Sequence, residues 1–234
     1  MKKKLVIIPA YNEQGNILKT VEDVEKNAPD FDYVVVNDCS TDDTLALCRA
    51  HGIHVLDLPI NLGIGGGVQT GYLYACRKGY DKAAQFDGDG QHNASYLGAM
   101  AKKLEEENLD MIIGSRYIEK KGFQSSGLRR VGIRYFTWLI HAMTKKRITD
   151  PTSGMRLCNR RMIEWFAFDY PRDYPEPESV TAALKSGMHI EELPVEMNER
   201  AEGVSSISAR NSVYYMIKVS IAVLMASSRK KKKG

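Results

Sequence analysis

The stretch LVIIPAYNE, residues 5–13, sets a pattern that repeats through the first half of this 234-residue chain. Four apolar residues, enough for a short buried strand, lead into a polar turn. Similar apolar runs return at residues 33–36, 53–58, 83–86 and 111–113. Amphipathic helical patterns separate them, at residues 13–27, 42–51, 65–78 and 94–107. This alternation predicts an α/β fold, with a Rossmann-like, mostly parallel sheet covered by helices on both faces.

The second half of the chain is less regular. It predicts helices at residues 128–143, 160–166, 178–186 and 213–226, and one strand at residues 189–195. Residues 170–177 contain three prolines and predict a loop. We therefore expect one globular domain over residues 1–207, followed over residues 208–234 by an amphipathic helix and a basic run.

Composition narrows the class of protein. Hydrophobic residues make up 43% of the chain, which suits a packed core, and the formal net charge of +4 is mild. We expect no nucleic-acid partner. The four cysteines show no C-x-x-C spacing, which disfavours a zinc site. The first apolar run is too short for a signal core, so we expect a cytoplasmic protein with reduced thiols.

The residues that follow the predicted strands form a consistent polar set. In parallel sheets, ligands bind beyond the carboxyl ends of the strands. The residues found there are Pro9, Ala10, Tyr11 and Glu13 after the first strand, Asp38 after the second, Asp87, Gly88, Asp89 and Gln91 after the fourth, and Arg116 after the fifth. The sequence therefore predicts a ligand site at this edge.

Asp87 and Asp89 flank a single glycine, so both carboxylates can face one ion. Two carboxylates with open coordination positions suit Mg²⁺ or Mn²⁺, which accept water and phosphate oxygens. The alternative is an ordinary solvated turn. Asp38 is in position to bind a nucleoside, while we expect Ser40 or Thr41 to cap the following helix.

The glycines at positions 63, 65, 66 and 67 suggest a phosphate loop but fail its details. The pattern G-x-G-x-x-G would need glycine at position 68, where Val68 stands, and no Walker lysine follows. We expect these glycines to allow close helix packing, and a nicotinamide-dependent oxidoreductase is disfavoured.

Seven ordered motifs resemble glycosyltransferase family 2, and most closely the polyprenyl-phosphate hexosyltransferases, which are similar to dolichyl-phosphate mannosyltransferase. The motifs are IPAYNE at 8–13, VNDCSTD at 36–42, NLG at 61–63, DGDGQH at 87–92, GSRY at 114–117, DPTSGMR at 150–156 and RAEGVS at 200–205. Gly88 and Gly90 depart from the bulkier residues often found between the acidic residues of the family.

The resemblance implies a GT-A type nucleotide-diphospho-sugar transferase fold and assigns roles to the polar set. Donor binding would fall to Pro9, Ala10, Tyr11, Glu13, Asp38, Asp87, Gly88, Asp89 and Arg200. The metal, Mg²⁺ or Mn²⁺, would be held by Asp87, Asp89 and Gln91. The acceptor phosphate would contact Arg116, Arg130, Arg134, Ser153, Arg200 and Ser205. Catalysis would depend on Asp87, Asp89 and Arg116.

The abundance of arginine favours a lipid-phosphate acceptor. A phosphate monoester is already an anion near neutral pH and needs cations rather than a base, whereas a hydroxyl needs a base. We therefore expect an inverting transfer of a hexose from a UDP- or GDP-sugar to a polyprenyl phosphate, in the synthesis of cell-surface glycans. The alternatives are a family 2 transferase that uses Glu176 or Glu178 as base on a saccharide hydroxyl, and a non-catalytic nucleotide-sugar binding protein. A nucleotidyltransferase is disfavoured, because residues 11–13 are unlike its glycine-rich loop.

The predicted helix at residues 213–226 carries one charge, Lys218, and is too short to span a bilayer. The basic run at residues 229–233 follows it. We expect this segment to bind an anionic membrane surface, which would make the chain peripheral on the cytoplasmic membrane face. The alternative partners of the helix are the protein's own core, a small integral membrane protein and a second copy of the chain.

Overall fold

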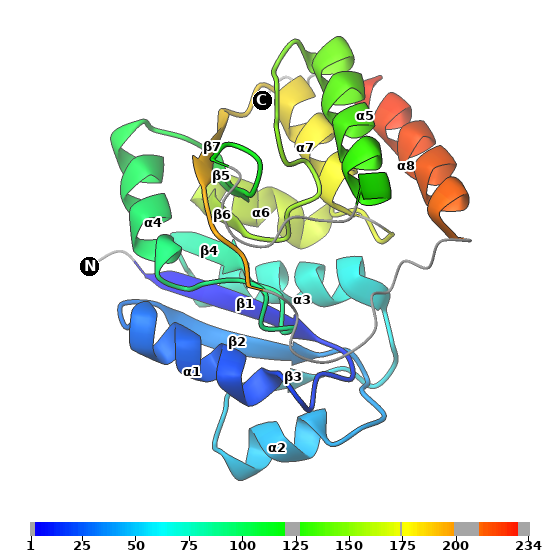
Figure 1. Cartoon of the computed structure of the whole chain (residues 1–234). Helices are drawn as coiled ribbons and strands as arrows, with labels where there is room; N and C mark the ends of the chain where they lie inside the picture. The colour runs from blue at the N-terminus through cyan, green and yellow to red at the C-terminus, as the bar shows by residue number, and fades with distance from the viewer. Residues whose placement is uncertain (1–2, 120–126, 174, 199–210, 229–234) are drawn as a thin grey trace.

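The computed structural model describes residues 3–119, 127–173, 175–198 and 211–228. A seven-stranded sheet runs through the molecule in the order β3-β2-β1-β4-β6-β5-β7 (Figure 1). The strands are β1 (Lys4–Ala10), β2 (Asp32–Asn37), β3 (Val55–Asp57), β4 (Lys82–Gln85), β5 (Met111–Ser115), β6 (Arg156–Asn159) and β7 (Ile190–Pro194). All neighbouring pairs are parallel except those of β6, which is antiparallel to both β4 and β5. The mostly parallel α/β sheet is thereby confirmed.

Helices cover both faces of the sheet, as the alternating pattern predicts (Figure 1). The helices of this part are α1 (Ile17–Asn27), α2 (Thr44–Ala50), α3 (Gly63–Lys78), α4 (Tyr96–Glu106) and α6 (Arg160–Phe168). One core lies where α1 and α4 pack on the side chains of alternate strand residues such as Val6 and Ile8. The other lies where α3 and α6 pack on the opposite set, which includes Leu5 and Ile7. Strand residues that alternate between two buried faces explain the continuous apolar runs.

Three further helices form a small layer outside the sheet sandwich. They are α5 (Gly127–Thr144), α7 (Pro175–Lys185) and α8 (Asn211–Ser227). Phe136 and Ile140 of α5 pack against Val219 and Val223 of α8, and all four side chains are buried. Because α7 contacts both helices and also belongs to the sheet core through Val180, it joins this layer to the main domain. One face of the C-terminal helix therefore packs on the protein's own core.

Two features differ from the sequence-based prediction. Strand β6 was not predicted, because its residues RLCN include a buried arginine and form no apolar run. Residues 170–177 were predicted to be a loop, but α7 begins at Pro175 and includes Pro177. The first turn of a helix tolerates proline, because its backbone N–H groups have no partner within the helix.

Candidate active site

The acidic motif follows β4 directly, at the carboxyl end of the central parallel strands. The backbone N–H of Gly88 donates to the carbonyl of Pro9 at 3.2 Å, which ties the motif to the end of β1. A Cβ atom at Gly88 would lie 3.0 Å from that same carbonyl oxygen. Glycine therefore permits the close approach of the two strand ends, and the segment that follows β1 lies next to the acidic pair.

Asp87 is held by two side chains that donate to its two oxygens. His92 Nε2 lies 3.2 Å from Asp87 Oδ2, and Gln85 Nε2 donates to Asp87 Oδ1 at 3.3 Å. His92 is buried against Phe86, with 5.3 Å between ring centroids, and its Nδ1 has no hydrogen-bond partner in the described part of the chain. The carboxylate is thus oriented before any ligand binds.

Asp89 and Gln91 shape the turn that follows. The backbone N–H of Gln91 donates to Asp89 Oδ1 at 3.0 Å, and the carbonyl of Gln91 accepts from the backbone N–H of Asn198 at 2.8 Å. The segment after β7 is therefore attached to the acidic motif. Arg200 and Ser205, two of the predicted site residues, lie outside the described residues.

A buried polar network lies behind Asp87 and was not predicted from the sequence. Gln85 bridges it: its amide nitrogen donates to Asp87, its amide oxygen accepts from Tyr170 Oη at 3.2 Å, and its side chain also donates to Glu176. Glu176 lies in the first turn of α7. One glutamine thus links the predicted metal ligand to the alternative base.

Arg156 supplies the positive charge of this network. Its side chain is fully buried and donates to three neutral oxygens, the carbonyls of Ser153 and Pro151 and the hydroxyl of Ser179, at 2.8–3.0 Å. Its charge also acts on Asp87 and Glu176. A buried cation is costly unless anions lie near, so the two carboxylates and the arginine stabilise one another. Arg156 was not among the predicted site residues, because it begins β6, a strand that the sequence did not predict.

The two carboxylates of the network differ in acidity. Burial acts to raise the pKa of Asp87, but the hydrogen bonds from His92 and Gln85 and the charge of Arg156 together hold it below the ordinary value. Burial and the negative charge of Asp87 raise the pKa of Glu176, against the opposing effect of Arg156. Asp87 is therefore a carboxylate suited to a cation, while Glu176 is the more basic group.

Asp38 is fixed by the motif at residues 61–63. The backbone N–H of Leu62 donates to Asp38 Oδ1 at 2.7 Å, and Asn61 Nδ2 donates to the Asp38 carbonyl at 3.1 Å. The aspartate is buried, with 4% of its surface exposed, at the end of β2. The third motif therefore orients Asp38, and Tyr11 stands 49% exposed after the neighbouring strand.

The turns after β1 and β2 interlock and correct one sequence-based prediction. Ser40 Oγ accepts from the backbone N–H of Asn12 at 3.0 Å, and Asn12 Oδ1 accepts from the backbone N–H of Thr41 at 2.8 Å. The prediction that Ser40 or Thr41 caps α2 is wrong. Asp42 Oδ1 accepts from the backbone N–H of Thr44 at 3.0 Å instead. The two hydroxyl residues join the turns, because Asn12 adopts a left-handed φ of 56° that aims its backbone and side chain at them.

Arg116 is engaged by a buried aspartate. Its Nε and Nη2 donate to the two oxygens of Asp150 at 2.6 and 2.8 Å. Glu192 of β7 in turn accepts from the backbone N–H groups of Thr149 and Asp150, at 2.8 and 2.9 Å. The segment at residues 149–156 is therefore fastened to β5 and β7. A direct role of Arg116 at a phosphate stays a prediction.

The remaining predicted acceptor residues lie in different surroundings. Ser153 is buried, and its hydroxyl accepts from the backbone N–H of Met155 at 3.2 Å. Arg130 and Arg134 are exposed on α5. Their contact with an acceptor phosphate stays a prediction.

The residues at the acidic motif fit a hard divalent cation. Asp87 and Asp89 offer carboxylate oxygens, and glycine at position 154 lets the neighbouring loop approach Asp87, because a Cβ there would lie 2.2 Å from Asp87 Oδ2. Among the described residues, no group of three or more Asp, Glu, His or Cys side chains could hold a metal by itself. An ion here would therefore complete its coordination with water or ligand oxygens, as Mg²⁺ and Mn²⁺ do.

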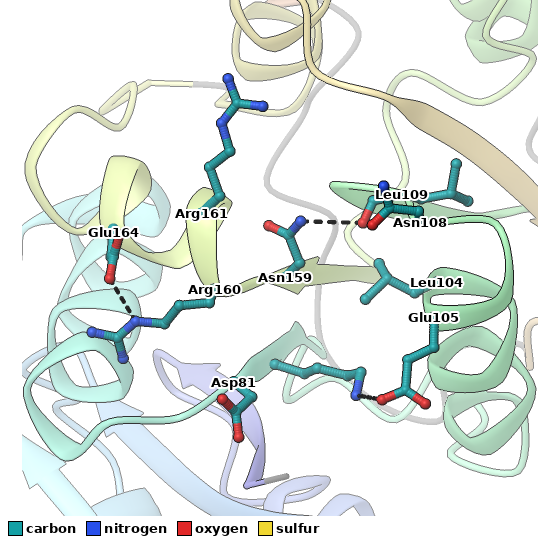
Figure 2. A pocket seen from close by; sticks show the side chains of 10 residues that line it. Asp81, Leu104, Glu105, Asn108, Leu109, Asn159, Arg160, Arg161 and Glu164 are labelled. Atoms are coloured by element: carbon teal, nitrogen blue, oxygen red, sulfur yellow. Dashed lines mark hydrogen bonds and ion pairs between the residues drawn. The ribbon is translucent and has the colours of Figure 1, made fainter. Parts of the chain in front are cut away.

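A separate pocket of about 440 Å³ lies at the opposite edge of the sheet (Figure 2). Lys82 at the start of β4 and Asn159 at the end of β6 line it. Lys82 pairs with Glu105 and Arg160 pairs with Glu164, and a dashed line in Figure 2 marks the Arg160–Glu164 pair. Because β4 runs from this pocket to Asp87, the pocket is not part of the acidic site.

Comparisons with known proteins agree with the fold and the motifs. The family model of glycosyl transferase family 2 matches residues 5–166. The chain is 29% identical to polyprenol monophosphomannose synthase of Mycolicibacterium smegmatis, over 93% of this chain and 86% of that protein. It is 28% identical to undecaprenyl-phosphate mannosyltransferase of Micrococcus luteus, over 87% of each.

Solved structures give the same fold at lower sequence identity. Glucosyl-3-phosphoglycerate synthase of Mycobacterium tuberculosis superposes with a TM-score of 0.74 at 17% identity, over 100% of this chain and 82% of that one. A second structure of that enzyme, in complex with Mn²⁺, UDP and glucosyl-3-phosphoglycerate, gives a TM-score of 0.71. The expected GT-A architecture is confirmed, and the chain belongs to glycosyl transferase family 2.

Proposed function

We propose that this chain is an inverting hexosyltransferase that moves a sugar from a nucleotide-diphosphate sugar to a polyprenyl phosphate. The observation that carries the proposal is the meeting of Asp87 and Asp89 with the turn after β1 at the carboxyl edge of the sheet, with Asp38 at the end of the adjacent strand. Two relatives named for polyprenol or undecaprenyl phosphate match most of this chain and support the acceptor.

The chain's own residues divide the work of donor binding. Asp38, oriented by Leu62, receives the nucleoside, and Tyr11, Pro9 and Ala10 line the neighbouring turn. Asp87 and Asp89 hold a divalent ion, together with Gln91. When bound, such an ion neutralises the charge that develops on the departing diphosphate. Arg156 and His92 keep Asp87 ionised and oriented for this role.

The transfer needs no proton acceptor when the acceptor is a phosphate. An anionic phosphate oxygen forms a bond to the anomeric carbon, and the bond from that carbon to the diphosphate oxygen breaks. The electron pair leaves with the nucleoside diphosphate, and the configuration inverts. We propose that Arg116, Arg130, Arg134, Ser153, Arg200 and Ser205 surround the acceptor phosphate. Because the acceptors of the relatives are membrane lipids, the reaction would take place at the cytoplasmic membrane face.

A second function is favoured by one contact. Glu176 shares Gln85 with Asp87, and burial raises its pKa, which are properties of a general base for a saccharide hydroxyl. The two acceptors predict different results for Glu176→Gln. Loss of a general base lowers the transfer rate by about 10²–10⁴-fold, whereas transfer to an anionic phosphate should keep its rate within about tenfold.

The test incubates the protein and Glu176→Gln with membrane lipid, Mn²⁺ and a panel of labelled UDP- and GDP-sugars. Label in the lipid extract with both proteins supports the lipid-phosphate acceptor. Label only in water-soluble glycan, and its loss in Glu176→Gln, supports the hydroxyl acceptor. Donor binding without label in either fraction would support the third alternative, a non-catalytic protein that binds a nucleotide sugar.

A further inference from the structure

The C-terminal helix leaves an apolar surface uncovered after it has packed on the protein. Val219, Val223 and Ala226 of α8 are buried against the rest of the chain. The side of α8 that faces away from the protein carries five apolar or aromatic residues that are each 45–69% exposed. We call them the outer stripe: Tyr214, Ile217, Ile221, Leu224 and Met225. Their spacing of three, four and seven residues places them along one side of the helix.

Helix α5 extends this surface. Tyr135 Oη lies 3.1 Å from Ser220 Oγ, which joins the two helices beside the outer stripe. Val131 and Trp138, one helical turn on either side of Tyr135, are 64% and 63% exposed. Figure 1 shows α5 and α8 side by side at the outside of the molecule. A continuous exposed apolar patch of this kind marks an interaction site rather than ordinary surface.

The charges around the patch identify the partner. Lys218 is the one charged residue between residues 213 and 226, and it pairs with Asp173 at 2.7 Å, at the side of the helix that faces the loop before α7. The five residues of the outer stripe carry no charge, but Lys218 Nζ lies over the ring of Tyr214, 5.6 Å from its centroid. Arg130 and Arg134 are exposed on α5, and the basic run at residues 229–233 follows the helix in the sequence. An apolar stripe bordered by cations fits a bilayer surface with anionic headgroups.

Two further observations separate a bilayer from a second copy of the chain. A symmetric dimer on this patch would bring two sets of these cations together, which like-charge repulsion opposes. Trp138 and Tyr214 are also the aromatic types that settle at the headgroup level of membranes. No helix in the described part of the chain is long and apolar enough to cross a bilayer.

We propose that the outer stripe of α8, with Val131 and Trp138 of α5, binds the surface of an anionic lipid bilayer. Helix α7 connects this surface to the site, because its first turn carries Glu176 beside Gln85 and its body packs on α8. The proposal goes beyond the proposed reaction and does not depend on it, since binding to vesicles requires neither donor nor acceptor.

The test is co-sedimentation of the whole chain with two kinds of vesicle, phosphatidylcholine alone and an equimolar mixture with phosphatidylglycerol. Three proteins are compared: wild type, Ile217→Glu/Ile221→Glu, and Phe168→Glu. Phe168 is 76% exposed at the end of α6, away from the patch, and serves as the matched control. Wild type and Phe168→Glu should bind the mixed vesicles. Ile217→Glu/Ile221→Glu should bind them with an affinity lower by at least about tenfold.

Charge is tested by replacing residues 229–233 with glutamine, which should weaken binding to the mixed vesicles and reduce its salt dependence to the part that Arg130 and Arg134 supply. Trp138→Ser gives a second, milder variant should the double variant fail to fold, as judged by its circular dichroism. Sedimentation of Ile217→Glu/Ile221→Glu, or of Trp138→Ser in its place, equal to that of wild type would overturn the proposal. So would a wild-type dimer in analytical ultracentrifugation that Ile217→Glu/Ile221→Glu converts to monomer, because the patch would then bind a second copy. Vesicle binding without sugar transfer would instead contradict only the proposed reaction.

Discussion

At the scale of single residues, the site depends on how closely backbone and charge can approach Asp87. Gly154 brings its backbone so near that a Cβ atom would lie 2.2 Å from Asp87 Oδ2. On the other side, His92 and Gln85 donate to the carboxylate, and Arg156 balances its charge. Asp87 is therefore fixed from several directions, whereas Asp89 lies on the turn that follows and accepts from its own loop.

Asp89→Asn should abolish metal-dependent donor binding. The amide removes the negative charge that a hard cation requires but keeps the shape of the side chain and its acceptor oxygen for the Gln91 N–H. Calorimetric titration of UDP and GDP, with and without Mn²⁺, measures the effect. Asp81→Asn, at the other end of β4, is the matched control and should bind as wild type does. Unchanged affinity in Asp89→Asn would remove the metal assignment.

Glu176→Gln should stabilise the fold at neutral pH and lose that advantage in acid. The pKa of Glu176 is raised in the folded protein, so between 4.5, its ordinary value, and the folded value the native state binds more protons than the unfolded one. Stability therefore falls as pH rises through this window, and the cost of the buried carboxylate is fully present above it. The glutamine variant carries no such cost.

Thermal unfolding of wild type and Glu176→Gln from pH 4 to pH 8 tests this sign. The difference in midpoint should be near zero below about pH 4.5 and should grow in favour of the variant as pH rises. Glu164→Gln, an exposed glutamate paired with Arg160, should show no such gain. A variant that is less stable than wild type at neutral pH would contradict the buried-charge account.

The aspartates of the site could be predicted from the sequence, but the network behind them could not. Asp38, Asp87 and Asp89 each follow an apolar run, and the ends of parallel strands meet at one edge whatever the details of packing. Gln85 and Arg156 lie within strands, where a polar residue carries no local signal of its partners. Their roles depend on β6 lying next to β4, a pairing between residues far apart in the chain.

At the scale of secondary structure elements, the glycines of α3 allow the helix to approach the sheet and a neighbouring loop. A Cβ atom at Gly65 would lie 2.2 Å from the carbonyl oxygen of Pro171, and one at Gly71 would lie 2.1 Å from Ile7 Cγ2 of β1. The backbone N–H of Gly65 donates to the carbonyl of Arg172 at 3.1 Å. The expectation of close packing is confirmed at Gly65, whereas Gly63 has no atom within 4 Å of its would-be Cβ and instead adopts a left-handed φ of 76°.

Gly71→Ala should destabilise the fold by about 1–3 kcal/mol, because Ile7 is fully buried and cannot move away from the added methyl group. Gly98→Ala is the matched control. That glycine is exposed in α4 with no atom within 4 Å of its would-be Cβ, so alanine should stabilise by about 0.5–1 kcal/mol. Urea unfolding of both variants measures the two opposite changes, and equal stability of Gly71→Ala and wild type would show that the helix and β1 can separate.

The sequence predicted helices and strands correctly where the apolar residues followed one clear pattern, either a continuous buried run or a helical repeat. The central strands β1 and β2 are mostly apolar because both of their faces are covered, and the helices that follow them are amphipathic. The prediction failed at β6, which is antiparallel, short and partly polar, and at the start of α7, where prolines resemble a loop. The predicted boundary between residues 207 and 208 lies outside the described residues, so the division into two segments stays a prediction.

At the scale of the whole molecule, the two edges of the sheet have different characters. The amino-terminal edge holds a pocket whose lysine and one of whose arginines are satisfied by neighbouring glutamates (Figure 2). The carboxyl edge holds Asp38, Asp87 and Asp89 together with the interlocked turns that follow β1 and β2. Because a pair of carboxylates can bind a divalent cation, and the cation in turn binds a diphosphate, the folded protein should gain stability when both ligands bind together.

This linkage gives the last prediction, which concerns the melting temperature of the whole chain. A ligand that binds only the native state, at a concentration of 100 times its Kd, adds about 2.7 kcal/mol to the free energy of unfolding. For a chain of this size, that raises the midpoint of thermal unfolding by about 5–10 °C. UDP or GDP with Mn²⁺ should produce this rise, and whichever nucleotide does so identifies the donor base. Nucleotide with EDTA should not, because the repulsion between the diphosphate and the acidic pair is then not neutralised. A rise of the same size without any divalent ion would mean that the aspartates bind the donor by some other arrangement, in which they do not face the diphosphate.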